Sequence, residues 1–314
     1  MMDKKAYISV VIPVFNEEAN LERLLSRLYP VLQSLGKSFE IIFTDDGSRD
    51  RSLAILREKS VEMPEIRIIE FNGNFGQHMA ILAAFEQCSG EIVITMDADL
   101  QNPPEEIPNL VDGIERGYDV VGTVRRDRRD TLFRRLASRL VNATVSRMTG
   151  MRMKDYGCML RAYHRNVIEN INRCRESTTF IPALAQTFAS NPVEIEVAHD
   201  GRTEGQSKYS LYKLIRLNFD LVTGFSVVPL QLFALLGIVT ASMSLIFALF
   251  LLIRRFIVGA EVEGVFTLFA IMFFFIGVVI FGIGFVGEYV GRIYQEVRRR
   301  PRYVVRRLHN FDHE

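Results

Sequence analysis

The sequence predicts an α/β fold: a mostly parallel sheet with helices on both faces, followed by two membrane-spanning helices. Over the first two-thirds of the chain, short runs rich in Ile, Val and Phe alternate with helical patterns. This alternation is typical of parallel sheets covered on both sides. Two later runs, each of more than 20 residues, contain no charged side chain. Runs of that length are long enough to cross a bilayer as helices.

Five apolar runs are the expected strands: Tyr7–Ile12, Phe39–Thr44, Ile66–Phe71, Glu91–Met96 and Asp119–Thr123. The first interval holds a leucine series at helical spacing: Leu21, Leu24, Leu25, Leu28, Leu32 and Leu35. Later intervals have helical patterns over Ser52–Glu62, Gln77–Cys88 and Glu105–Arg116. Parallel sheets bind ligands at the carboxyl ends of their strands. The residues that follow each strand are therefore the first candidates for a functional site.

The overall charge argues against one class of partner. The chain has 38 Lys and Arg against 37 Asp and Glu, a formal net charge of +1. This balance gives no overall field that would gather a nucleic-acid backbone, so we expect no nucleic-acid partner. The three cysteines form no Cys-x-x-Cys pair, which predicts reduced thiols in a domain facing the cytosol. The first residues contain no long apolar stretch, so no signal peptide is expected.

The two charge-free runs, Pro229–Ile253 and Val265–Val286, predict a transmembrane hairpin. The alternative, two helices buried in a soluble core, leaves unexplained why both runs are apolar on every face. Basic residues gather outside the hairpin, so both of its ends should lie in the cytoplasm. These flanking residues are Lys208, Lys213, Arg216, Arg292, Arg298, Arg299, Arg300, Arg302, Arg306 and Arg307.

Two further segments, 131–149 and 210–225, predict amphipathic helices at the membrane surface. An ordinary packed surface helix explains the first equally well. A polar segment with Arg202 and Lys208 precedes the second, at the depth where a lipid phosphate would lie; a charged linker held by anionic headgroups is the alternative. We therefore expect a cytoplasmic α/β domain over 1–200, a polar loop and juxtamembrane helix over 201–228, the hairpin over 229–288 and a basic cytoplasmic tail over 289–314.

Carboxylates follow the first two expected strands. Pro13, Phe15 and Glu17 supply a rigid turn, an aromatic face and an acidic group that could hold a base. An acidic turn at a helix N-terminus explains them as readily. After the second strand, Asp46 precedes Gly47, and a glycine allows the backbone to approach a ligand closely. An ordinary Asp-Gly turn is the alternative.

The fourth expected strand ends in the sharpest motif, Asp97-Ala-Asp99-Leu-Gln101. Two carboxylates one residue apart at the end of a buried strand repel each other unless a cation joins them. Oxygen ligands favour Mg²⁺ or Mn²⁺, and the scattered His and Cys residues do not have zinc-site spacing. Gln101 can offer a carboxamide oxygen. We therefore expect Asp97, Asp99 and Gln101 to hold a divalent metal.

An arginine follows the fifth expected strand. Arg125 lies at the strand end, where its guanidinium group could pair with phosphate oxygens. The segment 126–130 that follows is also explained as a solvated charged loop.

Four motifs together resemble the inverting family-2 glycosyltransferases of GT-A fold that act on polyprenyl phosphates. The resemblance covers nearly the whole chain. Its most specific stretches are 97–108 (DADLQNPPEEIP), 117–125 (GYDVVGTVR), 155–163 (DYGCMLRAY) and 287–294 (GEYVGRIY). It is strongest to members that transfer 4-deoxy-4-formamido-L-arabinose. The resemblance implies a UDP-sugar donor, undecaprenyl phosphate as acceptor, a bacterial inner-membrane location and a role in lipid A modification and polymyxin resistance. A homo-oligomer, as a tetramer, follows by family analogy alone.

By motif position, the resemblance implies a role for each candidate residue. The nucleotide would be held by Pro13, Phe15, Glu17, Asp46 and Asp97. The metal and diphosphate would be held by Asp97, Asp99 and Gln101, with Arg125 approaching phosphate, so that Asp97, Asp99 and Arg125 carry catalysis. The acceptor phosphate would meet Arg161, Arg202 and Lys208. Relatives often have Tyr where this chain has Phe15, which keeps stacking but loses a hydroxyl.

The chemistry expected from the resemblance is a single displacement that inverts the anomeric configuration. A phosphate acceptor is already ionised near neutral pH, so no strong general base is needed. Positioning and charge neutralisation should supply most of the rate. The alternatives are transfer of another sugar, such as glucose or mannose, and a non-catalytic membrane scaffold that keeps a nucleotide-binding fold. A processive polysaccharide synthase would need more membrane spans than two.

Overall fold

The computed structural model describes residues 5–125, 158–174, 180–197, 228–258, 265–298 and 300–311. The chain divides into two compact units, one of residues 1–214 with 301–314 and the other of residues 215–300. The two expected amphipathic helices over 131–149 and 210–225 lie outside the described residues.

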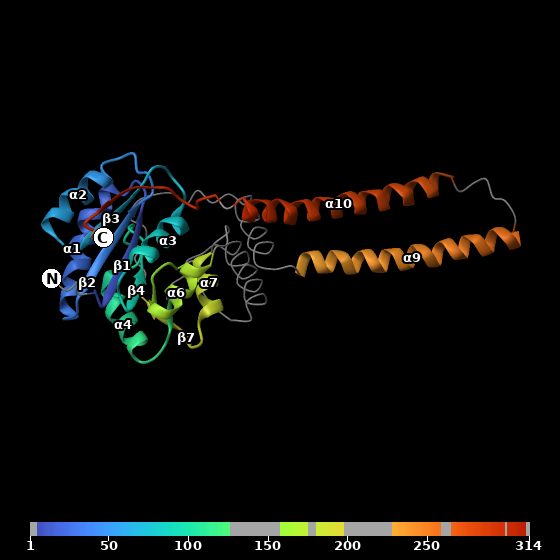
Figure 1. Cartoon of the computed structure of the whole chain (residues 1–314). Helices are drawn as coiled ribbons and strands as arrows, with labels where there is room; N and C mark the ends of the chain where they lie inside the picture. The colour runs from blue at the N-terminus through green and yellow to red at the C-terminus, as the bar shows by residue number, and fades with distance from the viewer. Residues whose placement is uncertain are drawn as a thin grey trace. The chain divides into compact units, whose positions relative to one another are not determined.

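In the first unit, the described strands form one sheet with the order β7-β5-β6-β4-β1-β2-β3-β8 (Figure 1). Their bounds are β1 Ile8–Val14, β2 Phe39–Asp45, β3 Ile66–Phe71, β4 Ile92–Thr95, β5 Val120–Arg125, β6 Arg161–His164, β7 Pro192–Val197 and β8 Val305–His309. Strands β4, β1, β2 and β3 run parallel, as do β5 and β7, whereas β6 and β8 pair antiparallel with their neighbours. The prediction of a mostly parallel sheet is confirmed.

Helices cover both faces of this sheet (Figure 1). Their bounds are α1 Glu18–Ser34, α2 Ser52–Glu62, α3 Gln77–Gln87, α4 Ile107–Glu115, α6 Arg165–Arg173 and α7 Ile181–Phe188, with a short 3₁₀ turn, η1, over Pro104–Glu106. In β1, Val10 and Ile12 belong to one core cluster and Val11 belongs to the other. This alternation follows from the two-residue period of a strand, which sends successive side chains to opposite faces.

The leucine series in the sequence forms the buried face of the first helix, α1. In α1, Leu21, Leu24, Leu25, Leu28 and Leu32 are all buried against the sheet. Their spacing places them on one side of the helix, so a single stripe of the sequence supplies the packing surface. Burial of one leucine side chain contributes roughly 1.5–3 kcal/mol, so these five side chains supply much of the free energy that packs α1 on the sheet.

The second unit contains the two long apolar helices, α9 (Val228–Val258) and α10 (Val265–Val297), which lie side by side (Figure 1). Both are long and apolar enough to cross a membrane, over Leu230–Leu251 and Ile271–Val297, and few of the described residues in these stretches are fully buried within the chain. Where they meet, the ring of Phe233 packs on Gly282 and lies 6.3 Å from the ring of Phe285. The predicted helical hairpin is present.

Candidate functional site

Parallel pairing brings the carboxyl ends of the central strands to one edge of the sheet. Val14 at the end of β1 is paired with Asp45 at the end of β2, and Val11 is paired with Thr95 at the end of β4. The N–H of Asp46 donates to the Val14 carbonyl oxygen at 2.9 Å, which extends this alignment past the strands. The residues that follow β1, β2 and β4 are therefore neighbours in space, as the sheet topology predicts.

Asp46 is held by the loop that follows β3. Its carboxylate accepts hydrogen bonds from the N–H of Phe75 at 2.6 Å and from the N–H of Gly76 at 2.9 Å. Burial raises the pKa of Asp46 above the ordinary 3.8, although the two N–H groups act against this. The carboxylate is thus fixed in one orientation, with its charge disfavoured by burial and supported by backbone donors.

Gly47 allows the chains after β2 and β3 to approach each other. Its φ is +75°, and a Cβ atom at this position would lie 2.7 Å from the backbone carbonyl carbon of Gly73. No other residue type fits this position without a backbone shift. The glycine expected from the Asp-Gly pattern is therefore required by backbone contact, as well as by the turn.

The residues after β1 are held by the turn after β2. Asn16 has a positive φ of 57°; its N–H donates to the Ser48 hydroxyl at 3.0 Å, and its side chain accepts from the N–H of Arg49 at 2.8 Å. The Glu17 carboxylate accepts from the Asn20 side chain at 2.6 Å. Phe15, in contrast, is 45% exposed, so its ring is open to a stacking partner.

The acidic motif after β4 is positioned from two sides. Gln77, the first residue of α3, donates from Nε2 to Asp97 Oδ1 at 2.6 Å. Asp99 Oδ1 accepts from the N–H of Gln101 at 3.1 Å. Leu100 between them has a φ of +60° and is buried, which turns the backbone sharply at this point. Both carboxylates remain partly exposed at the strand end.

The donor set is compatible with Mg²⁺ or Mn²⁺. Among the described residues, no three His, Cys, Asp or Glu side chains gather as a ready-made metal cage. Magnesium is usually bound by one or two carboxylates together with substrate phosphates and water. Asp97 and Asp99 match that requirement, with Gln101 two residues further on.

Arg161 lies on β6, the strand next to β4, and Arg125 lies on β5, one strand further from the acidic motif. Arg125 is the last residue of β5 and pairs with Val197 of β7. Arg161 opens β6, opposite Thr95 on one side and Gly122 on the other. Its side chain is completely buried, and its Nε donates to the Cys158 carbonyl oxygen at 2.8 Å. A fully buried arginine at a strand end is unusual, and its assignment to the site remains a prediction.

Buried polar contacts tie β5 to the acidic motif. The Thr123 hydroxyl donates to the Leu160 carbonyl oxygen at 2.8 Å and lies 2.9 Å from Cys158 Sγ. Cys158 Sγ in turn lies 3.4 Å from Asn102 Oδ1. This small network fixes the start of β6 against the residues that follow Gln101.

Two of the predicted acceptor residues, Arg202 and Lys208, lie outside the described residues. The residues brought to the carboxyl edge are Pro13, Phe15, Glu17, Asp46, Asp97, Asp99 and Gln101, with Arg125 and Arg161 on adjacent strands. Their assigned roles remain predictions.

The sequence reasoning missed the contribution of the residues after β3. The run Asn72-Gly73-Asn74-Phe75-Gly76 precedes α3, and it supplies the two N–H donors to Asp46. Gln77 and His78 follow at the start of α3. Burial lowers the pKa of His78 to about 4, and its Nδ1 has no hydrogen-bond partner among the described residues. The sequence signal for this loop was the pair Gly73 and Gly76, which lie between an apolar strand and a helical pattern and allow the backbone to approach a ligand or another loop.

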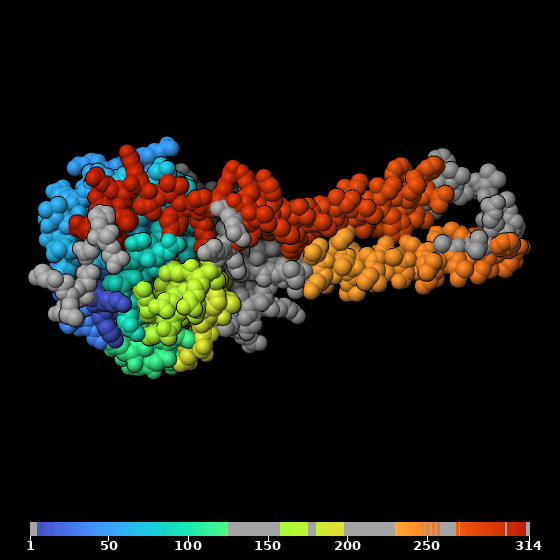
Figure 2. Space-filling model, viewed as in Figure 1, coloured from blue at the N-terminus to red at the C-terminus, as the bar shows by residue number. Residues whose placement is uncertain are grey.

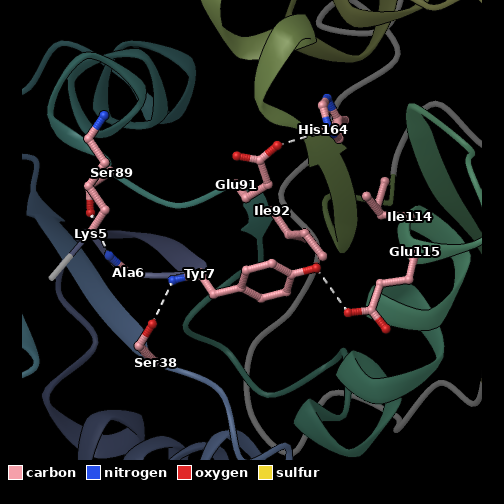
Figure 3. A pocket seen from close by; sticks show the side chains of 10 residues that line it. All are labelled: Lys5, Ala6, Tyr7, Ser38, Ser89, Glu91, Ile92, Ile114, Glu115 and His164. Atoms are coloured by element: carbon pink, nitrogen blue, oxygen red, sulfur yellow. Dashed lines mark hydrogen bonds and ion pairs between the residues drawn. The ribbon is translucent and has the colours of Figure 1, made fainter.

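A separate hollow of about 630 Å³ lies at the opposite edge of the sheet, where the parallel strands begin (Figure 3). Tyr7 and Glu115 face each other across it with a hydrogen bond of 3.0 Å, and His164 lies 3.2 Å from Glu91. None of the predicted site residues lines this hollow. The carboxyl edge is therefore the better candidate for chemistry.

Comparison with known proteins shows which family the chain belongs to. Residues 9–171 match the family model described as "Glycosyl transferase family 2". A protein of Edwardsiella ictaluri named undecaprenyl-phosphate 4-deoxy-4-formamido-L-arabinose transferase is 51% identical, over 96% of this chain and 94% of its own length. Proteins of the same name from Pectobacterium atrosepticum and Pseudomonas paraeruginosa are each 52% identical, over 98% and 96% of this chain and 95% and 90% of their own lengths.

A solved structure with the same fold is the glucosyl-3-phosphoglycerate synthase of Mycobacterium tuberculosis, crystallised with Mn²⁺, UDP and phosphoglyceric acid. It has a TM-score of 0.51 and 16% identity, and the match covers 70% of this chain and 77% of that chain. The family match and the near full-length relatives show that this chain is an enzyme that belongs to glycosyltransferase family 2.

Proposed function

We propose that this enzyme transfers a sugar from UDP to undecaprenyl phosphate, with inversion at the anomeric carbon and with a divalent metal. The best candidate for the sugar is 4-deoxy-4-formamido-L-arabinose. The observation that carries the proposal is the near full-length identity of about half to the relatives of that name. The acidic motif after β4 supports the metal, and the fold neighbour crystallised with Mn²⁺ and UDP has the same architecture.

The chain's own residues suit the donor half of this reaction. Phe15 presents an exposed ring on which a uracil base can stack, and Asp46 presents a fixed carboxylate that can accept from the base. We assign Pro13 and Glu17, which flank Phe15 in the chain, to the nucleotide as well. A Mg²⁺ or Mn²⁺ ion held by Asp97, Asp99 and Gln101 would supply charge neutralisation for the diphosphate.

The acceptor half depends on cationic side chains. An ionised phosphate oxygen attacks the anomeric carbon, and the bond to the UDP oxygen breaks as the new bond forms. Arg125 ends β5, two strands from β4 in the sheet, and we assign its guanidinium group to phosphate. We assign Arg161, Arg202 and Lys208 to the acceptor phosphate or the leaving group. No residue needs to act as a strong base, because the acceptor is already ionised.

The two apolar helices fit an acceptor that is itself a membrane lipid. They would anchor the enzyme in the bacterial inner membrane, with the catalytic domain on the cytoplasmic side where the flanking basic residues belong. The proposal includes the division into a catalytic domain (1–200), an acceptor loop with a juxtamembrane helix (201–228), the hairpin (229–288) and the basic tail (289–314). It also includes a role in lipid A modification and polymyxin resistance, and a homo-oligomeric state.

The test is product formation by the purified full chain in detergent with undecaprenyl phosphate and Mn²⁺. UDP-4-deoxy-4-formamido-L-arabinose should give a lipid-linked sugar, and UDP-glucose should give none. Asp99→Ala should abolish product, whereas Asp112→Ala, which removes an exposed carboxylate on α4, should not. Product from UDP-glucose alone would contradict 4-deoxy-4-formamido-L-arabinose as the transferred sugar. Product formed equally well without metal would contradict the metal dependence of the reaction. The absence of product from any donor would favour a non-catalytic scaffold.

A further inference from the structure

The segment that follows α10 returns to the catalytic unit and completes its sheet. Residues 301–311, here called the C-terminal segment, include β8, which pairs antiparallel with β3 (Figure 1). Figure 2 shows this segment in red on the surface of the blue and cyan N-terminal elements. The sequence pattern predicted only a basic tail here, so the contacts of this segment are new information about the site.

Tyr303 contacts the end of β3. Its ring stacks on Phe71 with 5.0 Å between centroids and 15° between planes, and the next residue, Val304, accepts a hydrogen bond from the N–H of Asn72 at 3.1 Å. Tyr303 also packs against the core cluster that holds the buried side chains of α3, and this burial and the nearby Glu86 carboxylate on α3 raise the pKa of its hydroxyl. Tyr303 therefore joins β3 and α3 at the end of the sheet where the donor site lies.

Phe71 connects Tyr303 to Asp46 through Phe75. Its ring meets that of Phe75 edge to face, with 5.5 Å between centroids and 87° between planes. The N–H of Phe75 is the donor that reaches the Asp46 carboxylate at 2.6 Å. Three successive contacts thus lead from Tyr303 to the carboxylate assigned to the nucleotide.

The C-terminal segment is fixed independently of this stack. Arg302 donates to the Cys174 carbonyl oxygen at 2.6 Å, and Asn310 donates to the Ile66 carbonyl oxygen at 3.0 Å. The buried Glu70 carboxylate lies 3.3 Å from His309 Nε2 and 3.4 Å from an Arg306 nitrogen. These anchors should keep β8 in place when the Tyr303 ring is removed.

We propose that Tyr303 is a positioning residue of the donor site, which acts through Phe71 and Phe75 to orient Asp46. The inference rests on the proposed UDP donor. Tyr303 follows Val297, the last residue of α10, by six positions, so the donor site depends on a segment joined directly to the second apolar helix. Tyr303 touches none of the residues assigned to the ligand, and its effect is expected on donor affinity rather than on the chemical step.

The test is a titration of UDP, with Mn²⁺ present, into the full chain carrying Tyr303→Ala, Tyr303→Phe or Leu308→Ala. Tyr303→Ala should weaken UDP binding by about tenfold and raise KM for the donor with little change in kcat. Tyr303→Phe keeps the stacked ring and should bind UDP nearly as wild type. Leu308→Ala removes a C-terminal-segment side chain that packs in the same core cluster, without touching the ring contacts, and serves as the control for stability.

Thermal unfolding of each variant separates positioning from folding. The inference holds if Tyr303→Ala loses affinity while Leu308→Ala, at equal or greater destabilisation, retains it. It is overturned if Tyr303→Ala binds UDP as wild type, or if both variants lose affinity in proportion to their loss of stability. Wild type that binds no UDP would overturn the proposed donor, and the inference with it.

Discussion

Gln77 Nε2 lies 2.6 Å from Asp97 Oδ1 and joins the first residue of α3 to the acidic motif after β4. The same stretch of chain supplies the N–H groups of Phe75 and Gly76 to Asp46. One loop between β3 and α3 therefore orients two carboxylates that belong to different strand ends. This loop connects the part of the site assigned to the nucleotide with the part assigned to the metal.

Removal of the Gln77 amide should weaken metal-dependent donor binding. Loss of a group that orients a metal ligand typically lowers metal affinity by about 10- to 100-fold. We expect Gln77→Ala to lower the affinity for Mn²⁺-dependent UDP binding by about tenfold, measured by calorimetric titration. Gln87→Ala, at the other end of α3, is the matched control and should bind as wild type. Equal affinities in the two variants would contradict the role given to Gln77.

Gly47 and Gly73 form a matched pair for a backbone test. A Cβ atom on Gly47 would lie 2.7 Å from the Gly73 backbone, and its φ of +75° strains any other residue, whereas a Cβ on Gly73 would meet nothing within 4 Å. Gly47→Ala should lower the free energy of unfolding by about 1–3 kcal/mol and weaken UDP binding. Gly73→Ala should do neither. Chemical denaturation of both variants checks this, and a tolerated Gly47→Ala would show that the close approach is not needed.

The raised pKa of Asp46 predicts the pH dependence of base binding. Burial raises this pKa above 3.8, so the carboxylate gains its proton at a higher pH than an exposed aspartate does. A protonated carboxyl group is a poorer acceptor, and uridine affinity should fall as the pH is lowered from neutral toward that raised pKa. Uridine carries no phosphate that titrates in this range, so it is the appropriate probe. Asp46→Asn should bind weakly at every pH, and a parallel pH profile in this variant would assign the titration to another group.

Gly282 tests the packing of the hairpin. A Cβ atom at this position would overlap the Phe233 ring, whereas a Cβ atom at Gly277 on the same helix would meet nothing within 4 Å. Gly282→Ile should force Phe233 away and lower the unfolding temperature in detergent, while Gly277→Ile should leave it near that of wild type. Both changes add the same apolar side chain to α10. Equal unfolding temperatures would mean that the Phe233 contact does not hold the two helices together.

The local pattern of the sequence was sufficient for the elements with strong periodicity. The leucines of α1 and the apolar runs of β1 to β5 predicted those elements and their order. The local pattern did not predict β8, because this strand pairs with a segment far away in the chain. His309, for example, contacts Glu70, which lies 239 positions earlier. The arginines of this strand predicted only a basic cytoplasmic tail, since no local signal shows which residues will pair with them.

At the site, too, the sequence predicted some features and only the structure showed the others. Sheet topology alone predicted that Asp46 and Asp97 would lie at one edge, because parallel strands end together. The groups that orient them are the backbone N–H of Phe75, in the loop after β3, and the side-chain amide of Gln77, at the start of α3, and no charged motif marks either position. Arg161 was predicted as a functional residue, but its complete burial could not be foreseen from its position in a short strand.

The carboxyl edge is tested as the donor site by titration of UDP into the purified full chain, with Mn²⁺ or with a chelator, for wild type, Asp97→Asn, Asp99→Asn and Asp112→Asn. Wild type and Asp112→Asn should bind UDP in the presence of Mn²⁺ and lose on the order of tenfold or more in affinity with the chelator. Asp97→Asn and Asp99→Asn should bind weakly under both conditions. UDP affinity that is independent of metal and unchanged in both variants would contradict the assignment of the carboxyl edge as the donor site.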